Sequence, residues 1–158
     1  MSLSFTWLGH STFLFRTPAG KRVLLDPWIA TNPSCPDPAR KVGPVDLLLI
    51  THGHFDHTAD AVAIGRQTGA QVVGAYELIK WLEAKGLRNT VGMNIGGTLR
   101  THGLTITMVP ALHSSSIEED GRTVYAGPAA GYVITLEDGL TVYFAGDTSV
   151  FGDMRLIR

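Results

Sequence analysis

The sequence predicts a single α/β domain spanning residues 1–158. Three short strand patterns open the chain, alternating strand and helix patterns follow them, and strand patterns return after residue 98. This order is typical of domains in which helices pack on a sheet. At 158 residues, with 44% hydrophobic residues, the chain has enough apolar side chains for one buried core.

The first strands are predicted over residues 3–7, 12–15 and 22–25. The first two segments alternate apolar and polar side chains, and the third is a short run rich in apolar residues. Turn-forming residues separate the three segments at positions 9–10 and 18–20.

A proline-rich segment follows over residues 27–44. It is too long and irregular for a simple connection, and long loops inside compact domains are usually functional. Cys35, the one cysteine of the chain, lies within it. We interpret Cys35 as an unreactive loop thiol, because a nucleophile needs an activating base that the sequence does not identify.

The middle of the chain predicts two strand–helix units. Residues 45–50 are apolar almost throughout, which is typical of a central strand buried on both faces. Residues 58–68 have helical spacing, 71–75 form a short strand, and 76–85 form a second helix. A glycine directly follows each helix, at the usual place for a helix end.

The last part of the chain predicts antiparallel strands. Residues 104–109 alternate, and residues 132–136 and 140–145 flank an Asp-Gly pair, which is a strong hairpin signal. A second Asp-Gly pair ends the acidic run at 118–121 and predicts another hairpin tip, and the His-Gly pair at 102–103 predicts an exposed turn.

Charge and hydropathy restrict the partners that we expect. The chain has 13 basic and 14 acidic residues, with a net charge of −1, so we expect no nucleic-acid partner. We expect no membrane association, because the first residues lack a leader pattern and no apolar run reaches the length of a bilayer span. A cytoplasmic protein that acts on a small molecule, as a monomer or a homo-oligomer, fits this composition.

Four potential metal ligands lie within six residues, between the buried strand and the first helix: His52, His54, Asp56 and His57. Imidazole and carboxylate groups suit zinc and related divalent ions. His52 and His54 can point at one ion, and Asp56 and His57 can turn toward a second. We expect Gly53 to let the backbone bend without a Cβ penalty. A cluster of surface histidines is the plainer alternative, and a helix cap by Asp56 is compatible with metal binding.

This segment resembles the H-x-H-x-D-H signature of the metallo-β-lactamase superfamily. The segments at 7–13 and 25–28 resemble more narrowly the uncharacterised metal-dependent hydrolases near ascorbate-6-phosphate lactonase. The resemblance implies an αββα sandwich. It also implies two further ligands, His113 after one strand and Asp147 after another.

The same resemblance implies the division of the ligands between two divalent metal ions. The first ion would take His52, His54 and His113, and the second Asp56 and His57, with Asp147 bridging both. Zinc is the expected metal, with manganese, iron or nickel as alternatives. A water activated between the ions would hydrolyse a small ester, lactone or phosphoester, and Asp56 would also orient that water.

Two residues near the cluster have two interpretations each. His10, in a turn, is either structural or, as the resemblance implies, a catalytic residue lining the pocket, where it donates to a substrate oxygen or forms a hydrogen bond with a metal ligand. Asp26 either caps a turn before Pro27 or accepts a hydrogen bond from a metal-bound imidazole.

The resemblance also implies a final metal-binding histidine beyond Asp147, whereas the sequence has no histidine after His113. We therefore expect the sandwich to lack its C-terminal part here. A non-catalytic metal-binding or assembly module, and a phosphodiesterase or nuclease of the same superfamily, are the alternative functions.

Overall fold

The computed structural model describes residues 2–157. Its larger sheet has six strands in the order β1-β2-β3-β4-β5-β6. The first three pair antiparallel, and β3, β4, β5 and β6 are parallel. The strands are β1 (Ser4–Trp7), β2 (Phe13–Arg16), β3 (Arg22–Leu25), β4 (Leu47–Leu49), β5 (Gln71–Ala75) and β6 (Thr90–Met93).

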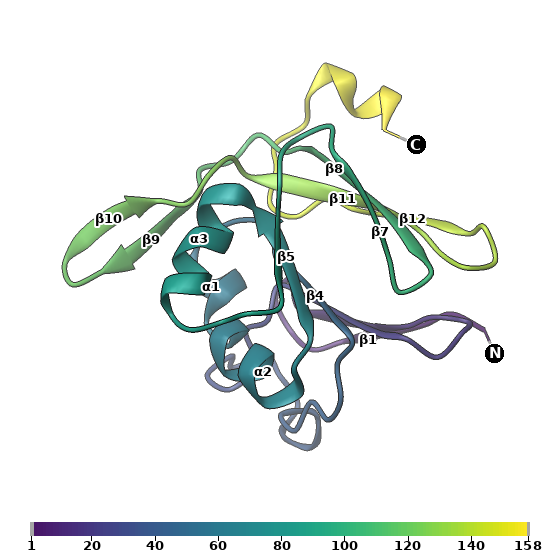
Figure 1. Cartoon of the computed structure of the whole chain (residues 1–158), viewed down its shortest axis with the longest axis horizontal. Helices are drawn as coiled ribbons and strands as arrows, with labels where there is room; N and C mark the ends of the chain where they lie inside the picture. The colour runs from purple at the N-terminus through teal and green to yellow at the C-terminus, as the bar shows by residue number, and fades with distance from the viewer. Residues whose placement is uncertain (1, 158) are drawn as a thin grey trace.

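The second sheet is antiparallel, with the order β12-β11-β8-β7. Between β8 and β11 the chain forms a separate hairpin of β9 and β10, which extends from the body of the domain (Figure 1). These strands are β7 (Thr98–Thr101), β8 (Leu104–Pro110), β9 (Ser116–Glu119), β10 (Arg122–Tyr125), β11 (Ala130–Thr135) and β12 (Thr141–Phe144).

Helices cover one face of the six-stranded sheet, and the four-stranded sheet covers the other (Figure 1). The helices are α1 (Phe55–Thr58), α2 (Ala61–Thr68) and α3 (Tyr76–Ala84), with 3-10 helices η1 (Asp37–Ala39) and η2 (Gly152–Leu156). Residues at the end of η2 lie against Val109 and Val133, on the outer face of the four-stranded sheet. The predicted αββα sandwich class is confirmed, and over residues 2–157 its fourth layer consists of η2.

Side chains of β4 alternate between two cores. Leu48 packs among the helices, whereas Leu47 and Leu49 pack between the sheets, and all three are fully buried. The strand is therefore buried on both faces, as its continuous apolar run predicts. Within residues 2–157 no helix is long and apolar enough to cross a membrane.

The predicted hairpin tips are confirmed by their backbone angles. Asp120 and Gly121 have φ of 51° and 71°, and His102 and Gly103 have φ of 52° and 82°. Two consecutive left-handed residues give the turn type whose twist matches that of paired strands. Asp120 and Gly121 thus form the tip of the β9–β10 hairpin, and Glu118 and Glu119 belong to strand β9.

One predicted element was wrong in detail, and strand β6 was not predicted. The predicted helix at 58–68 is two helices, because the chain breaks at Asp60, whose φ of −104° and ψ of 4° lie outside the helical range. Strand β6 has no alternating apolar pattern in the sequence. It contains Gly92, where a Cβ would lie 3.1 Å from the Cα of Tyr76, so this edge strand is shaped by its contact with α3.

Candidate metal centre

Segments from distant parts of the sequence meet at one edge of the two sheets. The β1–β2 turn carries His10, the segment from β4 into α1 carries residues 52–57, and the β8–β9 connection carries His113. Asp147 follows β12. In the six-stranded sheet this edge lies beyond the carboxyl end of parallel strand β4, where α/β proteins usually bind ligands.

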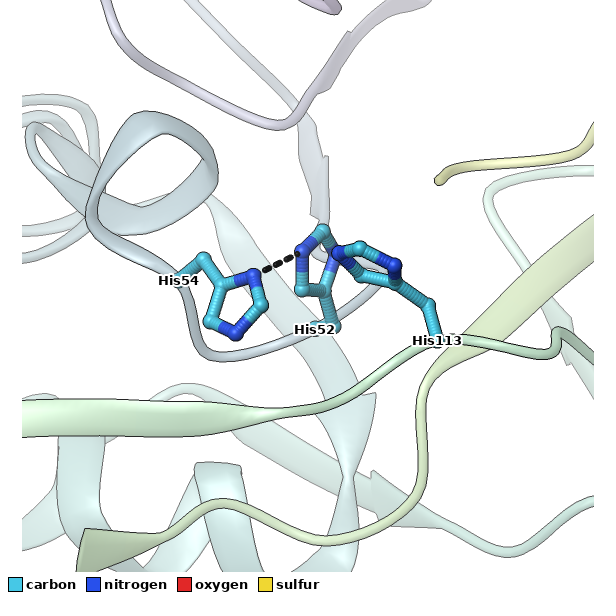
Figure 2. A group of neighbouring side chains, drawn as sticks. All are labelled: His52, His54 and His113. Carbon is cyan, nitrogen blue, oxygen red and sulfur yellow. Dashed lines mark hydrogen bonds between the residues drawn. The ribbon is translucent and has the colours of Figure 1, made fainter. Parts of the chain in front are cut away.

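The first group of potential ligands contains His52, His54 and His113. One ring nitrogen of each lies within 4.8 Å of the others. His52 Nε2 is 3.0 Å from His54 Nδ1, and Figure 2 shows the ring of His113 beside them. The structure thus brings together the three histidines that the resemblance assigns to one ion, although His113 lies 59 residues after His54 in the sequence.

The second group contains His10, Asp56 and His57, again with one ligand atom each within 4.8 Å. His10 Nε2 lies 2.9 Å from Asp56 Oδ2, and His57 Nε2 lies 3.9 Å from the same oxygen. The sequence assigned Asp56 and His57 to one ion, and His10, which the resemblance placed at the pocket, lies beside them.

Asp147 lies between the two groups. Its Oδ2 is 3.5 Å from His57 Nε2 and 3.9 Å from His113 Nε2. It also forms a group with His52 and His57 within the same 4.8 Å limit. Ser11, next to His10, donates a long hydrogen bond of 3.4 Å to Oδ1. The Asp147 carboxylate therefore faces both His57 and His113.

His57 provides an independent test of whether a metal fits. Its side chain is fully buried, and Nε2 has no hydrogen-bond partner among the described residues. An unpaired buried polar atom costs free energy, so native structures rarely leave one without a protein, water or ion partner. This nitrogen faces the carboxylates of Asp56 and Asp147, and a cation among the three atoms satisfies all of them.

Asp26 fixes the orientation of His57 from behind. Its buried carboxylate accepts hydrogen bonds from His57 Nδ1 at 2.8 Å, from the Thr51 N–H at 2.7 Å and from the Thr51 hydroxyl at 2.7 Å. Such a carboxylate keeps the proton on Nδ1 and leaves Nε2 free to bind a metal. Thr51 Oγ1 also lies 3.0 Å from His52 Nδ1, so the same network reaches both groups.

The pKa values of the histidines shift in different directions. Burial, reinforced by the neighbouring His57 and His54, lowers the pKa of His52 to about 2, and burial also lowers the pKa of His54. Neutral imidazoles are the form that binds metals. Burial acts to lower the pKa of His57 as well, but the hydrogen bond and charge of Asp26 outweigh it and raise that pKa. Burial raises the pKa of Asp26.

Gly53 is required for a reason other than the predicted backbone bend. The φ angle of Gly53 is not positive, so its backbone conformation does not itself require glycine. A Cβ on Gly53 would lie 2.4 Å from Ala126 Cβ and 3.1 Å from the Ser116 carbonyl oxygen. The ligand segment therefore packs directly against the base of the β9–β10 hairpin, where the Gly53 N–H also donates to Ser115 Oγ at 3.1 Å.

Other residues that the sequence singled out lie away from the ligand groups. The Cys35 side chain is buried in the helix-side core, and burial raises the pKa of its thiol, which agrees with an unreactive thiol. The loop at 27–44 is held by two residues that sequence reasoning missed. Asp60 accepts the N–H groups of Ile29 and Ala30 at 2.6 and 2.9 Å, and the Arg40 guanidinium donates to both of their carbonyls.

The chain matches known proteins over nearly its whole length. Residues 21–158 match a family model described as a beta-lactamase superfamily domain. A UPF0173 metal-dependent hydrolase of Rubrobacter xylanophilus is 50% identical over 153 residues, which are 96% of this chain and 63% of that protein. One from Koribacter versatilis is 46% identical over 156 residues, 99% of this chain and 67% of that protein.

A solved structure agrees with these sequence matches. Igni18, a metallo hydrolase from the archaeon Ignicoccus hospitalis, has a TM-score of 0.82 at 36% identity, covering 98% of this chain and 65% of that one. The chain thus spans 63 to 67% of the length of these relatives.

Proposed function

Since this chain belongs to the beta-lactamase superfamily, we propose that it carries the metal centre of a hydrolase that uses two divalent cations. The substrate is a small ester, lactone or phosphoester. The observation that carries the proposal is the buried Nε2 of His57, which has no hydrogen-bond partner within residues 2–157. His57 belongs to two of the three groups of potential ligands.

The ligand groups divide between the two cations by position. His52, His54 and His113 would hold the first. His57 and Asp56 would hold the second, and Asp147, which faces both groups, would contribute to both. The described donors are imidazole nitrogens and carboxylate oxygens without a thiolate, a set that suits zinc and also accepts manganese, iron or nickel.

Asp26, Asp56 and His10 would have separate roles around the cations. Divalent cations supply Lewis acidity, which polarises a carbonyl or phosphoryl oxygen and makes water a nucleophile near neutral pH. Asp26 holds the proton on His57 Nδ1, and Asp56 would orient a water beside the second ligand group. His10, one-third exposed and next to Asp56, is placed to donate from Nε2 to a substrate oxygen or to join the second ligand group.

Metal analysis combined with a panel of esters, lactones and phosphodiesters tests this function. We expect the purified chain to bind divalent metal and Asp147→Ala to bind about one equivalent less, with loss of hydrolysis. Asp153→Ala is the matched control, because Asp153 lies exposed in η2, outside the three groups. Unchanged metal content in Asp147→Ala refutes the shared carboxylate, and metal binding without any turnover supports the non-catalytic module instead.

A further inference from the structure

A cavity of about 590 Å³ opens beside the metal centre. Helices α1, α2 and α3 form one side of it and strand β9 forms the other. The side chains that matter for its chemistry are His54, Phe55, Ala59, Val62, Trp81 and Ile117. Its volume falls within the range of about 300–1,000 Å³ that small-molecule sites occupy.

His54 belongs to both the cavity and the first ligand group. Its Nδ1 faces His52 Nε2, and its Nε2 lies 3.3 Å from Ser114 Oγ. The imidazole therefore forms part of the boundary between the candidate metal ions and the cavity. A substrate whose reacting carbon lies at the metal centre can extend past His54 into this space.

The lining is mainly apolar, and its charge disfavours an anionic occupant. Among the described residues that line the cavity, Glu118 carries the one full negative charge, and there is no lysine or arginine. Phe55 is 65% exposed at the cavity and makes an edge contact with Trp28 at 6.0 Å between centroids. Trp28 in turn contacts the ring of His10 at 5.5 Å, so aromatic side chains connect the cavity with the second ligand group.

The β9 wall is held in place by polar contacts with α3. Trp81 Nε1 donates to Glu119 Oε2 at 3.2 Å, and Lys85 forms an ion pair with the same carboxylate. Ile117 is 6% exposed and packs in the helix-side core. The cavity is thus formed before any ligand binds, which reduces the ordering cost of binding.

We propose that this cavity is the subsite for an apolar acyl or alkyl group of the substrate, which makes an ester or lactone with a medium-length chain the preferred class. The inference rests on the proposed function, because it assigns the reacting group of the substrate to the metal centre. The absence of cationic side chains from the described lining places phosphoesters behind esters and lactones.

A homologous series of esters tests the subsite through hydrolysis. The probes are p-nitrophenyl acetate, butyrate, hexanoate and octanoate, assayed with the metal-loaded chain. We expect kcat/KM to rise by about fourfold for each buried methylene, until the cavity is full. Ala59→Trp places an indole in the cavity, and we expect it to remove this dependence, so that the ratio of octanoate to acetate hydrolysis falls toward one.

Ala63→Trp is the matched control. It is the same alanine-to-tryptophan substitution, made on α2. Position 63 lines a different cavity, which contains none of the potential metal ligands of the three groups. We expect it to keep the wild-type chain-length dependence. A dependence that survives in Ala59→Trp, or that is absent from the wild type, overturns the proposal.

Binding of 1-octanol to the metal-free chain, measured by calorimetry, separates failure of the subsite from failure of the function. We expect the wild type and Ala63→Trp to bind it and Ala59→Trp to lose binding. If no ester is hydrolysed but this pattern holds, the ester function fails and the apolar cavity stands. Equal binding by all three proteins overturns the subsite. So does an oligomer that Ala59→Trp converts to monomers, because the cavity is then an interface between copies.

Discussion

Replacing Asp26 by asparagine changes one atom of the buried network behind the metal centre. Oδ1 accepts the Thr51 N–H, and Oδ2 accepts both the Thr51 hydroxyl and the Nδ1–H of His57. Asparagine can keep the first bond, but it then places an NH2 group where Oδ2 was. That group donates, so His57 Nδ1 must accept and its proton moves to Nε2. Nε2 is the atom that faces Asp56 and Asp147.

The expected loss of metal affinity follows from the role of Asp26 as the residue that orients a metal-binding histidine. Loss of an orienting partner typically lowers metal affinity by about 10- to 100-fold. This corresponds to about 1.4–2.7 kcal/mol of binding free energy. The metal-free chain also loses hydrogen bonds to a charged acceptor, each worth about 1.5–3 kcal/mol, but the variant avoids burying a charge, so the net loss of stability is smaller than their sum. Metal binding is therefore expected to suffer more than folding.

Calorimetric zinc titration of the wild type and Asp26→Asn, with circular dichroism melts of the metal-free proteins, measures both effects. Asp46→Asn is the matched control, since Asp46 accepts the Arg22 N–H at 2.9 Å at the opposite end of β3. We expect the affinity of the second cation to fall in Asp26→Asn and both affinities to persist in the control. Equal zinc affinities in all three proteins would refute the tautomer argument.

Two further predictions concern His10 and Asp46. His10→Ala should weaken binding of the second cation and leave binding of the first unchanged, because His10 Nε2 lies 2.9 Å from Asp56 and outside the His52 group. Cobalt titration followed by absorption spectra measures both affinities, and His102→Ala, outside the three ligand groups, is the control. Two unchanged affinities in His10→Ala contradict the prediction. Burial acts to raise the pKa of Asp46, but the Arg22 N–H and Lys21 outweigh it and lower that pKa from 3.8. The Asp46 carboxylate therefore stabilises the fold above the unfolded-state pKa, and this stabilisation disappears as pH falls through the lower native pKa. The melting temperature of Asp46→Asn should lie below that of the wild type at pH 7, and a gap that does not narrow below about pH 4 contradicts the linkage.

Local signals in the sequence account for the elements that were predicted well. The left-handed turns at Asp120 and His102 depend on residues that adjoin each other, so an Asp-Gly or His-Gly pair suffices to predict them. The same holds for His52 to His57, where four potential ligands share one short connection after a buried strand.

Contacts between distant segments account for what the sequence did not reveal. His10 reaches Asp56 because the β1–β2 turn folds over the entrance of α1, and no spacing in the chain encodes that approach. The sequence left Asp26 between a turn cap and an acceptor for an imidazole; its φ of 46° is rare for a buried non-glycine residue, and its carboxylate accepts from His57 Nδ1. Gly53 looked like a flexible bend, although its neighbour Ala126 follows it by 73 residues.

The contact between Gly53 and Ala126 makes position 53 the best place to test how the ligand segment packs against the hairpin. Gly53→Ala adds a methyl group 2.4 Å from Ala126 Cβ, too close for either backbone to remain in place. Overpacking of this kind costs about 1–3 kcal/mol. At about 2–4 °C per kcal/mol for a chain of this size, the melting temperature should fall by about 2–12 °C.

Exchanging the two side chains tests the cause of that loss. Ala126→Gly alone removes a fully buried methyl group and should also destabilise the fold. In the double variant Gly53→Ala/Ala126→Gly the new methyl takes the space that the old one leaves, so the two losses should partly cancel. Recovery should be incomplete, because the Ser116 carbonyl oxygen and Ile117 Cγ1 still lie 3.1 and 3.2 Å from the added Cβ. If the melting temperature of the double variant falls by the sum of the single changes, the contact between Gly53 and Ala126 is not what excludes a side chain from position 53.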